Sequence, residues 1–385
     1  MKRIAATVAA LMLTVAGALS MSGCQPADEG EWLKDIYADY FPIGTSYQSG
    51  LYDMYDDLLP HFNSMSAEFE MKWTALQPSE GNFSFTAADE LLQYAQEHDM
   101  RMRGHCLVWY KALPSWVLAE GTTKEQALDR IGDHICAVME HYGNSVYCWD
   151  VVNEALANAP TQQQVDSGNF YRTGSEATGS ECGDWYALCG VDFIKEAFRA
   201  ADAAREELGL DVKLYYNDYG LNIPAKREAC LKMLRELLDE GIAIDGVGMQ
   251  GHYYIGDFNM TEFENSVRAF TELGLDVQVT ELDVSVYPYG PEKERYETLP
   301  ESIEAIQANL YGGIFEICRR YSDPWKEGAG EVTGVTLWGL ADDFTILDRE
   351  PIANRKNWPL LFDEEHRPKQ AYYAVTDFYN EVVSG

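Results

Sequence analysis

The chain has 385 residues, of which 46% are hydrophobic, and its formal net charge is −34. This length allows one large domain or two ordinary ones, and the apolar content suffices for a substantial core. Such a negative charge repels polyanions, so nucleic acid is excluded as an expected partner and a neutral or weakly charged ligand is favoured; a solvated acidic surface without any role in binding is the alternative.

Residues 1–23 have the pattern of a secretory signal peptide. Lys2 and Arg3 precede an apolar run that is shorter than the about 20 residues of a membrane-spanning helix. The residues that lead to Cys24 resemble a bacterial lipobox, although Met21 stands where leucine is usual. We therefore predict export across the inner membrane and an outer-membrane or cell-surface lipoprotein, lipidated on Cys24 and touching the membrane only through this anchor. A plain signal peptide with an incidental cysteine is the alternative.

Beyond Cys24 the chain has seven more cysteines. Cys182 and Cys189 are the one close pair in sequence, and if one helix covers both, its rise separates them by about 10 Å, too far for a disulfide. We therefore expect few or no disulfides. Three others lie in apolar patterns and are expected in the core as small residues: Cys106, Cys136 and Cys148.

Residues 24–38 are polar and acidic and predict a tether to a folded domain over residues 39–385. In that domain, short apolar β-type runs alternate with longer helical patterns eight times. The expected strands are Phe41–Tyr47, Met65–Trp73, Met100–Tyr110, Ser145–Glu154, Val212–Asn217, Gly246–His252, Asp276–Val284 and Val332–Leu340. Apolar residues three and four apart predict helices after them, such as Thr123–His141, Asp192–Leu208, Lys226–Glu240 and Pro300–Tyr321.

Eight consecutive βα units without a linker or a second pattern predict an α/β protein with a single catalytic domain, a closed (β/α)8 TIM barrel of roughly 345 residues. A doubly wound open sheet is the alternative. It is disfavoured because no glycine fingerprint follows the first strand, and because polar residues follow many strands rather than one switch point.

Polar and aromatic side chains gather at the C-terminal ends of seven expected strands, where such barrels carry their active sites. They are Glu68, Lys72, His105, Trp109, Asn153, Glu154, Asn217, Asp218, Gln250, His252, Glu281, Asp283 and Trp338. Taken singly, each has a plain structural explanation, such as a core histidine or a core tryptophan. Together they have the composition of a saccharide site, with amides and acids for sugar hydroxyls and aromatic faces for sugar rings.

Two of these residues, Glu154 and Glu281, end otherwise apolar runs. Burying an unpaired carboxylate is costly unless a partner or a pKa shift compensates. Two such acids indicate a reaction that needs both, and glycoside hydrolysis is the main chemistry that pairs carboxyl groups as proton donor and as nucleophile or base. Histidines are scattered without zinc-ligand spacing, and no phosphate-binding glycine loop is evident, so we expect no metal and no cofactor.

Seven short motifs surround these residues: Gly104–Trp109, Trp149–Ala155, Tyr216–Tyr219, Gly246–His252, Thr280–Asp283, Trp338-Gly339 and Pro359–Asp363. With them the chain resembles glycoside hydrolase family 10, the endo-β-1,4-xylanases, from about residue 41 to 380. The resemblance implies an endo-acting, retaining hydrolase of internal β-1,4-xylosidic bonds, with Glu154 as acid/base and Glu281 as nucleophile. We expect a monomer whose substrate is the polysaccharide xylan.

By the same resemblance, Asp283 supports His252, and His252 hydrogen-bonds Glu281. Glu154 must start protonated, beside the negative charge of Glu281, in order to donate its proton to the leaving group. Asn153 matches the family residue that bonds the sugar 2-hydroxyl. The further residues implied to bind substrate are Glu68, Lys72, His105, Trp109, Gln250, His252 and Trp338.

Three positions depart from the family pattern. Phe69 stands where asparagine is usual, Tyr110 where histidine is usual, and Ile346 where a second tryptophan is usual. A lost amide removes hydrogen bonds worth about 0.5 to 1.5 kcal/mol each, and isoleucine opens space beside the reacting sugar. We therefore expect a cleft that tolerates a substituted or differently linked backbone and binds plain xylan more weakly.

Two other functions are weighed against this one. The first is a related β-1,4-glycanase or aryl-glycosidase with altered subsites, which a panel of β-glucans and decorated xylans separates from a xylanase. The second is a catalytically weak, polysaccharide-binding surface lipoprotein. It is disfavoured because loss of function is expected to strike Glu154 or Glu281 first, and both are present.

Overall fold

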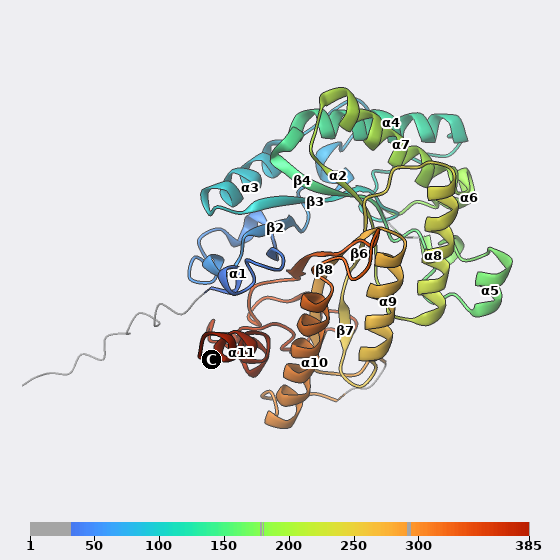
Figure 1. The fold of residues 1–385 in the computed structure, drawn as a ribbon. Coiled ribbons are helices and arrows are strands. Elements are labelled where there is room, and N and C mark those ends of the chain that lie inside the picture. Colours follow the sequence, from blue (N-terminus) through green and yellow to red (C-terminus); the bar gives the residue numbers. More distant parts are fainter. Residues whose placement is uncertain (1–31, 178, 180, 291–293, 385) are drawn as a thin grey trace, which may run out of the picture. The chain divides into compact units, whose positions relative to one another are not determined.

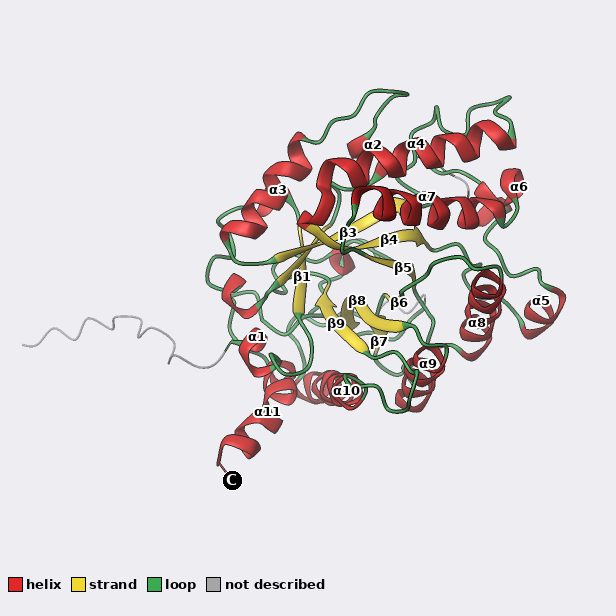
Figure 2. Ribbon diagram, turned by 45° about the horizontal axis from the view of Figure 1, so that its top comes forward, coloured by secondary structure: helices red, strands yellow, loops and turns green. Residues whose placement is uncertain are grey.

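Parallel strands close into a barrel that helices surround (Figures 1 and 2). The computed structural model describes residues 32–177, 179, 181–290 and 294–384. The strands are β1 Ile43–Tyr47, β2 Ser64–Ala67, β3 Arg101–Val108, β4 Val146–Asn153, β5 Lys213–Asp218, β6 Gly246–Met249, β7 His252–Tyr254, β8 Asp276–Ser285 and β9 Val332–Leu337. Each pairs in parallel with its neighbour from β1 to β6; β6 pairs with β8, β8 with β9, and β9 with β1. The pairing of β9 with β1 closes the ring, so the predicted TIM barrel is confirmed and the open sheet is excluded.

The helices lie outside this ring (Figure 2). They are α1 Leu33–Ile36, α2 Trp73–Leu76, α3 Thr86–Glu97, α4 Lys124–Tyr142, α5 Gln162–Ser167, α6 Trp185–Cys189, α7 Asp192–Leu208, α8 Pro224–Asp239, α9 Met260–Glu272, α10 Glu301–Arg320 and α11 Gln370–Ser384. Local sequence sets their ends. Thr123 and Gln126 form a capping box at the start of α4, worth about 1 kcal/mol, and Gly209 ends α7 in the left-handed conformation.

Two expected strands differ from the observed ones by more than a shift of their ends. The second is shorter, because the chain turns after Ala67 and Trp73 already begins α2. The sixth run is divided into β6 and β7, because Gly251 has a φ of +93° and breaks the strand. After that turn, His252 pairs with Asp283 of β8. Both changes occur at the C-terminal end of the barrel. They determine where the chain places Lys72, which precedes α2, and His252, which begins β7.

The barrel interior contains a buried charged layer that the sequence analysis did not predict. The guanidinium of Arg103 on β3 donates two hydrogen bonds to Asp150 on β4, and its Nε donates to Gln278 Oε1 at 2.9 Å. Arg103 and Asp150 are both buried. Asp150 Oδ2 also lies 2.8 Å from His105 Nδ1, so this layer supports one of the predicted site residues from below.

The predicted tether is folded wherever the structure describes it. Leu33 and Tyr37 are fully buried, and the Tyr37 hydroxyl donates to the carbonyl of Val375 in α11. The folded unit therefore includes residues 32–38, ahead of the predicted boundary at residue 39, because these apolar side chains pack into the core. The predicted signal peptide and Cys24 lie outside the described residues.

The seven cysteines in the described residues are free thiols. Cys106 and Cys148 are buried, as predicted, but Cys136 is exposed, because it lies on the outer side of α4. One helix does not cover Cys182 and Cys189, since α6 begins at Trp185. Within the described parts of the chain, no helix has the length and apolar character needed to cross a membrane.

Candidate active site

All the predicted site residues lie in the C-terminal half of a barrel strand or in the segment that follows it. They are Glu68, Lys72, His105, Trp109, Asn153, Glu154, Gln250, His252, Glu281, Asp283 and Trp338. Parallel strands of a closed barrel all end on the same face, so residues far apart in sequence converge there.

Glu281, on β8, is buried and held by donors on both carboxylate oxygens. Asn217 Nδ2 donates to Oε1 at 2.8 Å, and His252 Nε2 lies 3.1 Å from Oε2. His105 Nδ1 lies 4.0 Å from Oε1. Burial alone would raise the pKa of Glu281, but the hydrogen bond from His252 and the imidazole of His105 lower this pKa to about 2. Glu281 is therefore a carboxylate at every pH at which the protein is expected to work.

His252 lies between two carboxylates. Its Nδ1 is 2.9 Å from Asp283 Oδ2, and its other ring nitrogen faces Glu281. Burial opposes a charged imidazole, but the negative charges of Asp283 and Glu281 outweigh it and hold the pKa of His252 well above its ordinary value. His252 is thus an imidazolium that balances two buried acids. The β7–β8 register, in which His252 is the partner of Asp283, fixes this arrangement.

Glu154 follows β4 in a strained conformation with a φ of +55°. A non-glycine residue in this region costs about 1 to 3 kcal/mol unless its surroundings hold it there. Its backbone N–H donates to the carbonyl of Asn217 at 2.9 Å, and its own carbonyl accepts from Arg172 Nε at 2.8 Å. The side chain accepts one hydrogen bond from Gln250 Nε2, at 2.9 Å. The two glutamates therefore differ in their hydrogen bonds. The carboxylate of Glu281 contacts donors on both oxygens, whereas the side chain of Glu154 accepts from the Gln250 amide alone among the contacts described.

Asn217 at the end of β5 connects the two glutamate strands. Its amide oxygen accepts from Thr280 Oγ1 at 2.6 Å, and this bond leaves its Nδ2 to donate to Glu281 and to Asn153 Oδ1. Gly248 on β6 makes room for this amide, because a Cβ at that position would lie 2.2 Å from Asn217 Oδ1. Sequence reasoning placed Asn217 at a strand end but gave it no role.

Arg172, in the loop after β4, was missed altogether. Besides the carbonyl of Glu154, its guanidinium donates to Asn158 Oδ1 at 2.6 Å and to the Tyr219 hydroxyl at 2.8 Å. It also lies 4.2 Å from the ring centroid of Tyr110. Tyr110, one of the three departures from the family pattern, is thus a packing surface for this arginine. A lone arginine in a long loop gives no sequence signal for such a role.

Aromatic rings and a lysine line the next part of the face. Lys72 Nζ lies 4.8 Å from the ring centroid of Trp109 and 5.1 Å from that of Phe69. Phe69 is 51% exposed, so its ring faces solvent at the position where the family usually has an amide. Trp338, directly after β9, packs its ring edge-on against those of His105 and His252.

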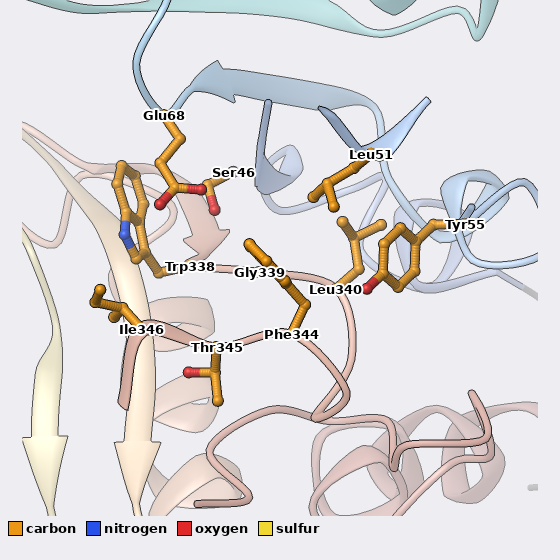
Figure 3. Close-up of a pocket in the computed structure, with 10 residues that line it drawn as sticks. All are labelled: Ser46, Leu51, Tyr55, Glu68, Trp338, Gly339, Leu340, Phe344, Thr345 and Ile346. Atoms are coloured by element: carbon orange, nitrogen blue, oxygen red, sulfur yellow. The ribbon is translucent and has the colours of Figure 1, made fainter. Parts of the chain in front are cut away.

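Two hollows open on this face. One, of about 260 Å³, is lined by Glu154 together with Trp109, Tyr110, Arg172 and Tyr186. The other, of about 350 Å³, is shown in Figure 3 and has Glu68, Trp338 and Ile346 on its wall. Ile346 is 40% exposed and begins a short 3₁₀ turn in the loop after β9.

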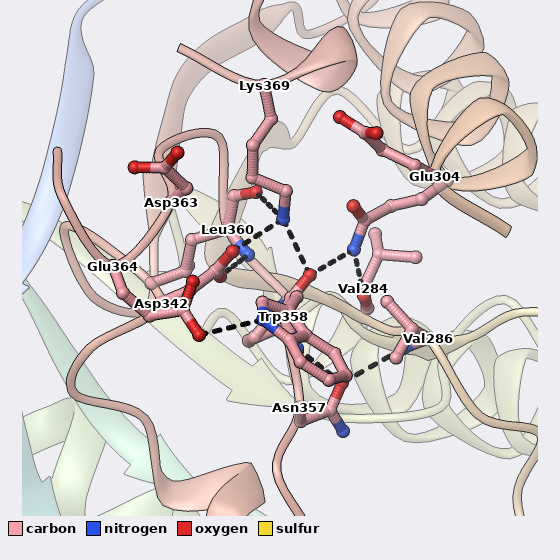
Figure 4. Close-up of polar contacts among 12 residues, drawn as sticks. Val284, Val286, Glu304, Asp342, Asn357, Trp358, Leu360, Asp363, Glu364 and Lys369 are labelled. Carbon is pink, nitrogen blue, oxygen red and sulfur yellow. Dashed lines mark hydrogen bonds and ion pairs between the residues drawn. The ribbon is translucent and has the colours of Figure 1, made fainter. Parts of the chain in front are cut away.

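Buried polar contacts hold the base of the loop that carries Ile346 (Figure 4). Lys369 Nζ donates to Asp342 Oδ2 at 2.7 Å and to the carbonyls of Trp358 and Leu360 at 2.7 and 2.8 Å. Asp342 in turn accepts from the backbone N–H of Leu360 at 2.8 Å. Burial raises the pKa of Asp342 to about 6, against the opposing effect of Lys369. The ion pair joins both ends of the loop, and sequence reasoning did not find it.

Among the described residues, no group of three histidine, cysteine, aspartate or glutamate side chains is arranged to hold a metal ion.

Comparisons with known proteins agree with this geometry. The family model described as glycosyl hydrolase family 10 matches residues 32–378. A β-1,4-xylanase of Dictyoglomus thermophilum is 40% identical over 347 residues, which cover 90% of this chain and 90% of that protein. The solved structure of a Thermobacillus composti GH10 xylanase has 36% identity and a TM-score of 0.76, covering 90% of this chain and 99% of that one. A mutant protein solved in complex with xylotriose has 34% identity and a TM-score of 0.80, covering 90% of this chain and 100% of that one.

Proposed function

The chain belongs to glycosyl hydrolase family 10, and we infer that it is an endo-acting, retaining β-1,4-xylanase that hydrolyses internal bonds of xylan. One observation about the site supports this function above all. Two buried glutamates share one face of the barrel, and only Glu281 is surrounded by donors that keep it charged. Retaining hydrolysis needs such a pair, with one carboxylate as nucleophile and one carboxylic acid as proton donor.

In the first step, Glu281 attacks the anomeric carbon while Glu154 gives its proton to the leaving glycosidic oxygen. The bond to the leaving sugar breaks as the bond to the Glu281 oxygen forms, and a glycosyl-enzyme results. Glu281 is then an uncharged ester, so Glu154 loses its anionic neighbour. In the second step Glu154 takes a proton from water, the water oxygen attacks the anomeric carbon, and Glu281 leaves as a carboxylate.

The surrounding residues have supporting roles in this proposal. Asn217 and His252 orient the nucleophile, and the positive charge of His252 keeps it ionised; Asp283 fixes the imidazole. Asn153 bonds the sugar 2-hydroxyl, a contact that strengthens as the oxocarbenium-like transition state develops. The sugar subsites are formed by Glu68, Lys72, His105, Trp109, Gln250 and Trp338.

Product analysis on arabinoxylan and glucuronoxylan tests the reaction, with Glu281→Ala as the control. We expect the wild type to release xylooligosaccharides whose new reducing ends are first formed as the β-anomer, as proton NMR detects. Retained activity in Glu281→Ala, or products first formed as the α-anomer, would contradict the mechanism.

Rescue by azide distinguishes the two glutamates, because a small anion fills the space that alanine leaves. With Glu281→Ala, azide takes the place of the nucleophile and gives an α-glycosyl azide. With Glu154→Ala, it attacks the glycosyl-enzyme and gives a β-glycosyl azide. The opposite pairing of variant and product would exchange the two assignments.

We also propose that the N-terminal segment directs export and that Cys24 carries a lipid anchor on an otherwise monomeric enzyme. The basic residues Lys2 and Arg3, the apolar run after them and the lipobox-like sequence support this. Labelling cells with a radioactive fatty acid tests it: label is expected on the wild type and not on Cys24→Ser. Label on both proteins, or on neither, would contradict lipidation at this residue.

Gel filtration of the enzyme without residues 1–24 tests the oligomeric state. We expect the protein to elute at the mass of one chain.

A further inference from the structure

Arg172 is a buried arginine whose hydrogen-bond partners carry no charge. Its side chain is buried, and its guanidinium donates to the carbonyl of Glu154, the amide oxygen of Asn158 and the hydroxyl of Tyr219. A buried charge is costly unless its surroundings compensate for the lost water. Three neutral oxygens give part of this compensation, and aromatic rings give another part.

Two rings flank the guanidinium, and they follow the two strands that pair with β4. The ring centroid of Tyr110, after β3, lies 4.2 Å from the guanidinium carbon of Arg172, and that of Tyr219, after β5, lies 5.8 Å from it. Behind Tyr219, Lys226 Nζ lies 3.6 Å from the same ring centroid and 2.8 Å from Asp218 Oδ1. A cation is attracted to an aromatic face, and more strongly where water is excluded. Arg172 is therefore held from two sides.

Tyr110 has the properties that this contact needs. Its ring is neutral, whereas the histidine that is usual in the family would repel Arg172 whenever it took up a proton. Burial is the main cause that raises the pKa of Tyr110, and the negative charge of Glu154 adds to it, so the phenol keeps its proton. The carbonyl of Tyr110 accepts from the backbone N–H of Gly183 at 2.8 Å, which fixes the point from which the ring extends.

Arg172 contacts Glu154 at the backbone, where Glu154 is strained. The φ of +55° is a conformation that persists only where the surroundings hold it. The hydrogen bond from Arg172 Nε to the Glu154 carbonyl is one of the two backbone contacts that do so. Because the backbone conformation sets the direction of the side chain, a shift of Arg172 would also move the carboxyl group of Glu154.

We propose that Tyr110 is a positioning residue for the proton donor: its ring holds Arg172 against the backbone of Glu154 and so directs the Glu154 carboxyl group toward the leaving oxygen. The inference rests on the proposed function, in which Glu154 is the proton donor, and it adds a residue to that step. Tyr110 itself transfers no proton. A misplacement of about 1 Å can lower a rate roughly a hundredfold, but it matters little for a leaving group that departs without a proton.

The test compares kcat/KM for dinitrophenyl and phenyl β-xylobioside, because this constant reports the steps up to the glycosyl-enzyme. Dinitrophenolate departs without a proton, whereas a phenol has a pKa of about 10 and needs one. Tyr110→Leu should lower kcat/KM for the phenyl substrate about tenfold or more, and for the dinitrophenyl substrate about twofold at most. Glu154→Ala should show the same pattern more strongly. Tyr110→Phe keeps the ring and should behave as the wild type.

Tyr147→Leu is a matched control. The guanidinium carbon of Arg101 lies 4.4 Å from the ring centroid of Tyr147, and these residues lie at the start of the same two strands, β3 and β4, at the opposite end of the barrel from Glu154. This variant should leave the ratio of the two constants unchanged. If Tyr110→Leu does not fold, as circular dichroism shows, Tyr110→Met takes its place with the same expectation, because methionine fills more of the space of the ring.

Equal losses on both substrates in the variant without a ring would overturn the inference, since Tyr110 would then act in binding or in folding alone. A change of the ratio in Tyr110→Phe or in Tyr147→Leu as large as that in Tyr110→Leu would overturn it as well. These outcomes leave the proposed function intact as long as Glu154→Ala loses the phenyl substrate selectively. Equal losses on both substrates in Glu154→Ala would refute the assignment of Glu154 as proton donor.

Discussion

Replacing His252 by glutamine should make the enzyme sensitive to acid in a range where the wild type is not. The substitution keeps a hydrogen-bond donor near Glu281 but removes the positive charge between the two carboxylates. Asp283 and Glu281 then remain buried without the imidazolium that balances them. Protonation of the nucleophile becomes easier, since a carboxylic acid tolerates burial better than a carboxylate does.

The magnitude follows from the pKa of Glu281, which is about 2 in place of an ordinary 4.5. Each tenfold change in an acid constant is 1.36 kcal/mol, so this difference is roughly 3 kcal/mol in favour of the charged form. His252 supplies the largest of the lowering contributions. Without it, burial raises the pKa of Glu281 back toward 4.5. Because the nucleophile must be ionised, activity is present above this pKa and is lost as the pH falls through it.

The assay is kcat/KM on an aryl β-xylobioside between pH 3 and 8, with circular dichroism at each pH to confirm that the protein stays folded. The wild type should show no acidic limb from Glu281 in this range, because its pKa is about 2. His252→Gln should lose activity progressively below about pH 5. An acidic limb at the same pH in both proteins would refute the reasoning, since Glu281 would then not depend on the charge of His252.

Three further predictions concern residues that support the site. Gly248→Ala should displace the Asn217 amide that holds Glu281, because the new Cβ would lie 2.2 Å from Asn217 Oδ1. We expect kcat to fall about tenfold or more, with little change in melting temperature. An unchanged kcat would show that Gly248 is not needed to position Asn217. Lys369→Met should lower the free energy of unfolding in urea by about 3 to 5 kcal/mol, because it leaves the carboxylate of Asp342 buried without its ion-pair partner. Adding Asp342→Leu should recover part of this loss. Equal stability of the wild type and Lys369→Met would show that the ion pair does not stabilise the protein. Arg172→Lys should lower kcat with KM nearly unchanged, because one ammonium group cannot reproduce the three separate hydrogen bonds that the guanidinium donates. Wild-type kinetics in this variant would refute a role of Arg172 in positioning Glu154.

The sequence by itself determined the architecture and grouped residues that the structure brings together. Eight repeats of an apolar run and a helical pattern were enough to predict the barrel, because each strand is buried on both faces and each helix on one. The closed ring then brings every strand end to one face. Residues at strand ends could therefore be grouped without coordinates, and this grouping found Glu154, Glu281 and their partners His252 and Gln250.

Only the tertiary structure decided how these residues differ from one another. Whether a glutamate stays charged depends on donors contributed by other strands, and a pattern along one strand does not reveal them. Asn217 reaches Glu281 because Gly248 clears its path, and Arg172 returns from a loop to hold the backbone of Glu154. Such contacts join segments that are distant in sequence, so packing in three dimensions sets them while local periodicity does not. The same holds for residues 32–38 of the predicted tether, where Leu33 and Tyr37 pack into the core despite their polar neighbours.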